Sequence, residues 1–399
     1  MAYQSLRKIY YTRSGEHAKA YAERFNSPLT RRFDFPIREY GRSRDFPAFF
    51  CYTEDFALLS EEISLKHEEL LQALNAVPPL VLEQFVLACV VDEVRATSDI
   101  EGIHSTRREI KDVMRGAHSD RFSSLVRKYS ALLGTGAINF KTCQDVRDFY
   151  DDFAQKEIAA ANPTHKLDGV LFRRDSVDIT SHTGKIIHRG VLPESRIIEM
   201  LDTALNVLND AGIPLLARVA IFHYMFEYIH PFYDGNGRTA RFIVSCFLST
   251  RFNSLAALRL SCLIKKNRKA YYNLFAEADS EWNCGDLTPF VLGFTKIFAA
   301  TFDDITAALN NKIAQLAKYQ QKLLSEVGDD ALTRRIYTAL LQSSVFFGGG
   351  VNMRALMRLT GKARNTIKSR LAAMPASHLL TITAADGTIF YRLNLSILD

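Results

Sequence analysis

The stretch His230-Pro231-Phe232-Tyr233-Asp234-Gly235-Asn236-Gly237-Arg238 separates two helical patterns and decides how the middle of this chain folds. Apolar residues recur at helical spacing from 215 to 229 and again from 238 to 252. Pro231 has no amide hydrogen and biases the residue before it away from helical backbone, so the first helix should end at His230. The two glycines permit tight or left-handed turns before the next helix. The sequence therefore predicts two helices joined by a short loop that has a histidine at its entrance.

Several groups with chemical potential gather in this loop. His230 sits at a helix end, facing the loop, where its ring can act as a base. The first amides of the following helix have no partner within the helix and lie at the positive end of its dipole, so they can bind an anion. Arg238 and Arg241 can reach the same anion, and Asp234 offers the carboxylate oxygen that Mg²⁺ requires. Each part alone is more often structural, but together they are what nucleotidyl or phosphoryl transfer needs.

Residues 230–241 match the signature of the Fic family, His-Pro-Phe-x-Asp/Glu-Gly-Asn-Gly-Arg-x-x-Arg, at every fixed position. The chain therefore resembles Fic enzymes, which implies transfer of AMP from ATP to a Ser, Thr or Tyr hydroxyl of a protein. The resemblance implies His230 as general base, Asp234 as Mg²⁺ ligand, amides around Gly235, Asn236 and Gly237 on the α-phosphate, and Arg238 and Arg241 on the β- and γ-phosphates. A related branch that transfers phosphate has lysine in place of Gly237, so the glycine favours AMP transfer. The loop leaves transfer of UMP or phosphocholine open.

Two further features resemble parts of Fic enzymes. Tyr271 and Tyr272 are similar to the family's nucleoside-contacting tyrosines, although packing between helices explains them almost as well. Residues 172–191 read as a hairpin, with Val177-Asp178-Ile179 and Lys185-Ile186-Ile187-His188 flanking Ser181-His182-Thr183-Gly184. This hairpin resembles the Fic flap, which aligns a target segment by adding a strand to it. The resemblance places the target-binding edge at Lys185, Ile186, Ile187 and His188.

A third feature, Thr97-Ser98-Asp99-Ile100-Glu101-Gly102, resembles the Fic inhibitory pattern Ser/Thr-x-x-x-Glu-Gly/Asn. The resemblance implies that Glu101 pairs with Arg241 and blocks the productive position of the γ-phosphate. In some relatives this glutamate also positions a water that removes AMP from modified targets. The alternative is that Glu101 is a solvated charge at a helix end.

The whole chain is expected to be mainly α: a Fic-type helical core with a β-hairpin flap, followed by a C-terminal winged helix-turn-helix domain. We divide it into residues 1–110, an N-terminal arm and helices with the inhibitory motif; 111–327, the catalytic core; and 331–399, the winged helix-turn-helix. The first fifty residues show no sustained period and read as an irregular arm. Helical periodicity covers the remaining long elements, at 56–75, 80–98, 194–208, 266–278 and 288–327.

The C-terminal segment differs from the rest in charge. Beyond residue 330 nine basic side chains stand against two acidic ones, a net charge of +7, whereas the preceding 41 basic and 42 acidic side chains give −1. Helices are predicted at 332–341, 352–359 and 363–374, followed by two strands around Asp386-Gly387. Three helices and a hairpin make a winged helix-turn-helix, so the basic surface is a candidate for DNA binding.

Composition sets the remaining expectations. The 399 residues are 47% apolar and 24% charged, which is typical of a soluble globular protein. The sequence has neither an 18-residue apolar run nor the features of a signal peptide, so a cytoplasmic location without a membrane partner is expected. The six cysteines lack metal-binding spacing and are expected to be reduced thiols.

The partners follow from these readings. They are ATP and Mg²⁺, a protein substrate that can be the chain itself, either DNA or a protein bound through residues 331–399, and, compatible with the sequence, a second copy in a homodimer. The competing interpretation is a DNA-binding regulator whose Fic core transfers another group or acts as a sensor. The two interpretations differ in whether the loop at 230–241 or the basic C-terminal segment carries the main activity.

Overall fold

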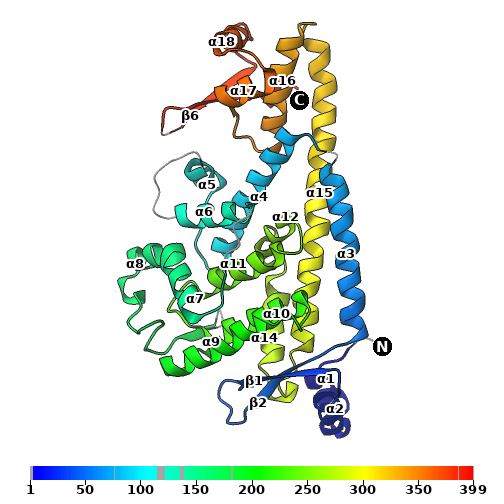
Figure 1. Cartoon of the computed structure of the whole chain (residues 1–399), viewed down its shortest axis with the longest axis vertical. Helices are drawn as coiled ribbons and strands as arrows, with labels where there is room; N and C mark the ends of the chain where they lie inside the picture. The colour runs from blue at the N-terminus through cyan, green and yellow to red at the C-terminus, as the bar shows by residue number, and fades with distance from the viewer. Residues whose placement is uncertain are drawn as a thin grey trace.

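Helices dominate the computed structural model, which describes residues 3–75, 77–114, 122–134, 139–180, 183–384 and 386–398 (Figure 1). The longest, α15 (Thr288–Glu326), runs beside α3 (Glu54–Asn75) along much of the molecule. α4 (Pro79–Ile100) begins with Pro79 in its first turn, where a missing amide hydrogen costs nothing. Within the described residues, no helix combines the length and apolarity needed to cross a membrane.

The expectation of an irregular N-terminal arm is wrong. This part contains α1 (Leu6–Thr12), α2 (His17–Phe25) and an antiparallel pair of strands, β1 (Thr30–Ile37) and β2 (Phe46–Cys51). The strand pattern is hidden in the sequence because β2 is buried on both faces, so apolar and polar residues do not alternate along it. The edge of β2 away from β1 pairs with backbone far along the chain, since the amide of Leu287 donates to Phe49 O at 2.8 Å.

The centre of the molecule is a set of shorter helices. They are α5 (Arg107–Met114), α6 (Ser123–Ala131), α7 (Cys143–Tyr150), α8 (Lys156–Ala161), α9 (Glu194–Asn209), α10 (Leu215–Ile229), α11 (Asn236–Ser249), α12 (Ser254–Ala257), α13 (Leu260–Lys266) and α14 (Arg268–Ala278). α10 is apolar on nearly every side and is buried as the central helix, packed against α9, α11 and α15. Its observed bounds are the predicted ones, whereas α11 begins two residues before the predicted start.

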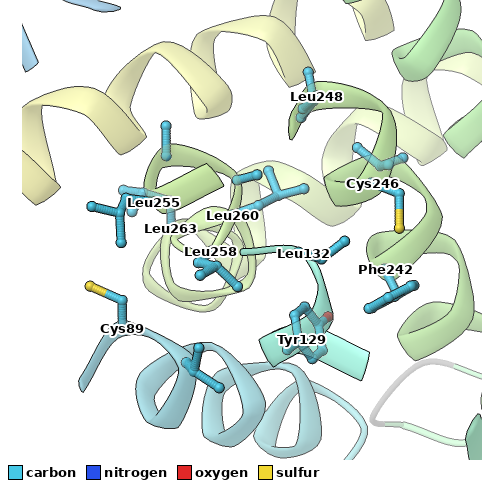
Figure 2. Close-up of a cluster of buried hydrophobic side chains, with 14 of the residues drawn as sticks. Cys89, Tyr129, Leu132, Phe242, Cys246, Leu248, Leu255, Leu258, Leu260 and Leu263 are labelled. Atoms are coloured by element: carbon cyan, nitrogen blue, oxygen red, sulfur yellow. The ribbon is translucent and has the colours of Figure 1, made fainter. Parts of the chain in front are cut away.

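A cluster of apolar side chains fixes α11 against its neighbours (Figure 2). Phe242 of α11 meets Tyr129 of α6 edge to face, with ring centroids 5.0 Å apart, and stacks on Phe149 of α7 at 4.7 Å. Figure 2 also shows Cys89 of α4 and Leu263 of α13 in this cluster. All six cysteines are free thiols, five of them buried. Because α11 is held on several sides, the loop at its N-terminus has a rigid base.

A second pair of strands, β3 (Asp178–Thr180) and β4 (Ile186–Arg189), forms an antiparallel hairpin at the predicted place. Ser181 and His182, in the predicted turn, lie outside the described residues. The register shifts by one residue between Ile179 and Thr180. The hairpin stands over the end of α10, since the amide of Gly190 binds Val177 O and that of Val191 binds Ile229 O.

The C-terminal segment contains three helices and three short strands. They are α16 (Ala331–Phe346), β5 (Val351–Asn352), α17 (Met353–Thr360), α18 (Arg364–Ala372), β6 (Leu379–Thr383) and β7 (Ile389–Leu393), with the sheet order β5-β7-β6. α16 packs against α4 and α15, and its buried Ser343 donates a hydrogen bond to Gln84 of α4 at 3.1 Å. The apolar core is therefore continuous from α4 into this segment.

Candidate active site

The loop between α10 and α11 has an unusual backbone at its first residue. α10 ends at Ile229, and His230 takes the left-handed conformation, with φ of 53°. Only a small share of residues other than glycine adopt this conformation. The amide of His230 still binds Phe226 O at 2.9 Å, so the turn completes the helix before Pro231 leads the chain away.

A buried arginine that the sequence analysis did not single out holds this turn. Arg173 is fully buried, and its guanidinium donates to His230 O at 2.8 Å, Val191 O at 2.9 Å and Asp175 O at 2.7 Å. Burial lowers the pKa of Arg173 to about 10, so it is still a cation at neutral pH. A cation at the C-terminus of α10 meets the negative end of the helix dipole. Arg173 thus fixes the direction in which His230 leaves the helix.

Gly190 leaves room for this arrangement. A Cβ atom there would lie 2.3 Å from a guanidinium nitrogen of Arg173 and 3.1 Å from Cβ of His230. Neither distance is compatible with the present positions, so any larger residue would displace the arginine, the histidine or both.

Two side chains of the loop itself close it. Phe232 is fully buried and stacks on Tyr150, with ring centroids 3.7 Å apart. The buried Asn236 accepts a hydrogen bond from the amide of Phe232 at 2.9 Å and donates one to its carbonyl at 2.8 Å. The loop is therefore anchored by packing and by two hydrogen bonds within itself.

The ring of His230 is held as a neutral base. Its Nδ1 lies 3.2 Å from the carbonyl of Glu227, one helical turn earlier, and this acceptor assigns the proton to Nδ1. The lone pair is then on Nε2. Burial is the main cause that lowers the pKa of His230, to about 4. At neutral pH the imidazole is therefore uncharged and ready to accept a proton.

An anion cradle follows directly after the loop. α11 begins at Asn236, with Gly235 in the left-handed conformation before it, and its first amides point out of the helix without acceptors inside it. Asp234 lines the pocket beside this cradle. Within the described residues no three His, Cys, Asp or Glu side chains form a metal cluster. A single accessible carboxylate fits Mg²⁺, which takes one or two carboxylates and completes its coordination with phosphate and water.

The two arginines of the motif occupy different places. Arg238 is fully buried behind the loop, with Nη1 3.1 Å from Glu157 Oε1, and does not line the pocket. Arg241 lines the pocket, although only 1% of it is exposed. Its Nη2 donates to Glu101 Oε1 at 2.6 Å, and its Nε donates to Thr97 Oγ1 at 3.0 Å. Burial is the largest single influence and disfavours a charged Glu101, but the charge and the hydrogen bond of Arg241, together with the charge of Arg238, outweigh it and hold the pKa of Glu101 below its ordinary value.

The end of α4 presents both partners to Arg241. Thr97 and Glu101 are four residues apart and so lie on one face of the helix. Gly102 ends the helix in the left-handed conformation, with φ of 77°. Gly237 faces this pair, because a Cβ there would lie 2.3 Å from Glu101 Oε1 and 2.7 Å from Arg241 Nη1. The glycine therefore permits the carboxylate to reach the arginine across the cradle.

His230, the stretch 234–237, Arg241 and Glu101 line a pocket of about 470 Å³. One wall is a face of α14 with Tyr271, Tyr272 and Phe275, and another is the β3–β4 hairpin, including Lys185 to His188. Tyr271 is buried, with its hydroxyl 2.7 Å from His223 Nε2, whereas the ring of Tyr272 is 45% exposed. His188 is buried and bonds to Tyr228 O through Nε2 at 2.7 Å. The predicted nucleoside and hairpin residues thus border the same pocket as the loop.

The N-terminal hairpin supplies a wall that the sequence analysis missed. Glu39 and Tyr40, between β1 and β2, line the same pocket. Glu39 accepts the amide hydrogen of Glu281 at 2.8 Å, and Tyr40 lies over the guanidinium of Arg189. No local pattern in residues 38–45 indicates such a role, because it depends on the pairing of β1 with β2.

Comparison with known proteins identifies the central region. Residues 142–248 match the model of the Fic/DOC family, so the chain carries a Fic/DOC domain. It is 30% identical over 125 residues to "Protein adenylyltransferase Fic" of Drosophila sechellia and 27% identical over 154 residues to that of Drosophila erecta. These alignments cover 31% and 39% of this chain. The chain spans about a quarter of the length of these curated relatives, 23% and 28%.

A solved structure shares the fold over most of the chain. The crystal structure of a Fic family protein from Desulfovibrio desulfuricans G20 superposes with a TM-score of 0.50 and 22% identity, covering 86% of this chain and 97% of that one. The mainly helical, Fic-type architecture is therefore shared with a protein of known structure.

Proposed function

We propose that the chain is a protein adenylyltransferase that transfers AMP from ATP to a Ser, Thr or Tyr hydroxyl of a protein. The observation that carries the proposal is a neutral His230 that lines the same pocket as Arg241 and the first residues of α11, whose amides form the cradle. The Fic/DOC match and the relatives named as adenylyltransferases support it.

The reaction follows from this geometry. His230 Nε2 takes the proton of the target hydroxyl, whose oxygen attacks the α-phosphorus of ATP. The bond from that phosphorus to the α–β bridging oxygen breaks, and pyrophosphate leaves. The amides of Asn236 and Gly237 stabilise the charge on the α-phosphate. Asp234 would hold Mg²⁺, which when bound neutralises phosphate charge.

The two arginines divide the remaining work in this proposal. Arg241, at the pocket wall, is assigned to the β- and γ-phosphates. Arg238 is assigned mainly to holding the loop, because it is buried against Glu157 rather than exposed to the pocket. Tyr271 and Tyr272 are assigned to the nucleoside side of the pocket. The edge of the β3–β4 hairpin from Lys185 to His188 is assigned to the target segment.

The pairing of Glu101 with Arg241 supports autoinhibition. An arginine that already donates to a carboxylate 2.6 Å away is not available to the γ-phosphate, so ATP binds outside its reactive position. Removal of AMP by a water that Glu101 activates is part of the same proposal. A modified target incubated with the wild type and with Glu101→Gly tests it, and equal loss of AMP from both excludes such a role.

The position of a label in ATP shows which group of the nucleotide is transferred. ATP labelled at the α-phosphorus should leave its label on the protein, whereas ATP labelled at the γ-phosphorus should not. Retention of the γ label would indicate phosphate transfer, and retention of neither would indicate that the nucleotide is not the donor. His230→Ala should abolish labelling, because the catalytic base is lost.

A second function is favoured by the surface of α18. Among its basic side chains, Arg364 and Lys368 are exposed, and Lys362 is exposed just before the helix. We propose that residues 331–399 form a winged helix-turn-helix that binds DNA with this helix, and that the chain divides at about residues 110 and 330. Because α16 is part of the continuous core, the test is made in the full chain. Arg364→Glu with Lys368→Glu should weaken DNA binding and flatten its salt dependence; unchanged binding would exclude this surface.

A further inference from the structure

Five carboxyl groups line the pocket, and four of them already have partners. Glu39 accepts from the amide of Glu281 at 2.8 Å, and Asp279 accepts from the hydroxyl of Tyr224 at 2.7 Å. Glu101 is paired with Arg241, and Asp234 accepts from the amide of Gly235. Each of these four therefore accepts at least one hydrogen bond within the protein.

The fifth, Glu227, has an oxygen without a donor. Its Oε1 is buried and has no hydrogen-bond partner within the described residues. Its Oε2 lies 3.8 Å from His230 Nδ1, which is too far for a hydrogen bond. A buried carboxyl oxygen without a donor is costly, so a group of a bound ligand is the natural partner. Burial, together with the nearby charge of Glu101, raises the pKa of Glu227 to about 8.

The position of Glu227 indicates which part of a nucleotide it would meet. It lies on the last turn of α10, one turn before His230. It also interacts electrostatically with Arg241 and Glu101, which lie at the phosphate end of the pocket. Tyr271 is near enough to Glu227 for the two to interact electrostatically, and Tyr272 and Phe275 of the same helix, α14, line the same pocket. In a nucleotide the ribose stands between phosphate and base. Carboxylates are recurrent acceptors for ribose hydroxyl groups.

We propose that Glu227 accepts a hydrogen bond from a ribose hydroxyl of the bound nucleotide and selects ribonucleotides over their deoxy forms. The inference rests on the proposed function, because it requires a nucleotide in this pocket. Both the charged and the neutral carboxyl offer an acceptor oxygen, so the contact does not depend on the protonation state. The residue determines specificity and takes no part in bond making.

The test measures binding, in a Glu101→Gly background that frees Arg241. Affinities for ATP, 2′-deoxy-ATP and 3′-deoxy-ATP are compared by calorimetry with and without Glu227→Met. In the Glu101→Gly background, loss of the contacted hydroxyl should weaken binding about tenfold, as expected for one hydrogen bond to a buried carboxyl group. With Glu227→Met, ATP and the deoxy nucleotide should bind within about threefold of each other.

Matched controls separate this role from a structural one. Glu39→Gln changes a carboxyl of the same pocket that is already satisfied, so discrimination should be unchanged. Glu227→Met removes a buried acid without a donor, and its melting temperature should not fall. Glu227→Gln keeps an acceptor oxygen and should retain part of the discrimination. These three results together would identify the acceptor as the source of selectivity.

Several outcomes would overturn the inference. Equal binding of ATP and both deoxy nucleotides in the background would show that no ribose hydroxyl is read. If the preference for ATP over the deoxy nucleotides survives Glu227→Met, another residue contacts the ribose hydroxyl. If Glu227→Met instead abolished discrimination against a purine triphosphate without the 6-amino group, Glu227 would contact the base. Because these are binding measurements, selective ATP binding without AMP transfer would contradict only the proposed function.

Discussion

Replacing Glu101 by glycine should activate AMP transfer, and the contacts of Arg241 set the size of the effect. Arg241 Nη2 donates to Glu101 Oε1 at 2.6 Å and to Thr97 O at 3.1 Å, while Nε donates to the hydroxyl of Thr97 at 3.0 Å. Without Glu101 the arginine stays oriented and gains a free donor for the γ-phosphate. One charge-assisted hydrogen bond is worth about 1.5–3 kcal/mol. Since about 1.4 kcal/mol is a factor of ten, kcat/KM for ATP should rise roughly tenfold to a hundredfold.

The variant should also be less stable until ATP binds. A buried guanidinium that loses its carboxylate costs about 3 kcal/mol, an upper figure because Glu101 is partly exposed and Thr97 remains. ATP should therefore raise the melting temperature of Glu101→Gly more than that of the wild type. Initial rates of AMP incorporation at low ATP measure the activation, and Glu101→Gln, which keeps the shape but not the charge, should be intermediate. Equal rates for wild type and a folded Glu101→Gly would refute the inhibitory role.

Three further predictions concern the loop. Gly190→Ala should lower kcat at least tenfold, because the added Cβ displaces Arg173 or His230. Gly15 has open space around it, so the control Gly15→Ala should leave kcat unchanged. Equal kcat values for the two variants would contradict this prediction. Asn236→Ala should cost about 2–4 kcal/mol in denaturant unfolding, because it leaves the amide and carbonyl of Phe232 unpaired; a cost below about 1 kcal/mol would show that they find other partners. His230 must be neutral to act as the base, and burial lowers its pKa to about 4. The kcat/KM of Glu101→Gly should therefore stay constant as the pH falls to about 5. A loss of activity centred near pH 6.5, the ordinary pKa of histidine, would contradict the burial argument.

Sequence alone was informative where the determinants are local. The end of α10 follows from Pro231, and its beginning from the start of helical periodicity at Leu215. Thr97 and Glu101 reach Arg241 because a spacing of four residues puts them on one face of a helix. The β3–β4 hairpin likewise follows from two short β-prone runs around a turn.

Features that depend on distant contacts were not predictable in the same way. Arg173 follows Leu171-Phe172 and gives no local sign that it enters the core to bind the end of α10. The β1–β2 hairpin reaches the pocket only because β2 packs on the start of α15. Arg238 and Arg241 look alike in the motif, but their surroundings differ. Arg238 is buried against Glu157, whereas Arg241 lines the pocket.

The continuity of the core also changes how the C-terminal segment should be studied. α16 buries its apolar face against α4, the helix that carries Glu101 at its end. Deleting residues 331–399 would expose that face and would confound loss of DNA binding with loss of folding. Substitutions on exposed α18 avoid this difficulty.

The most direct measurement is the intact mass of purified Glu101→Gly after incubation with Mg²⁺ and ATP, with Glu101→Gly/His230→Ala as control. The account predicts a mass increase of one or more AMP groups, on the protein itself or on an added lysate protein, that disappears without His230. The absence of any AMP adduct from a folded variant that still binds ATP would contradict it.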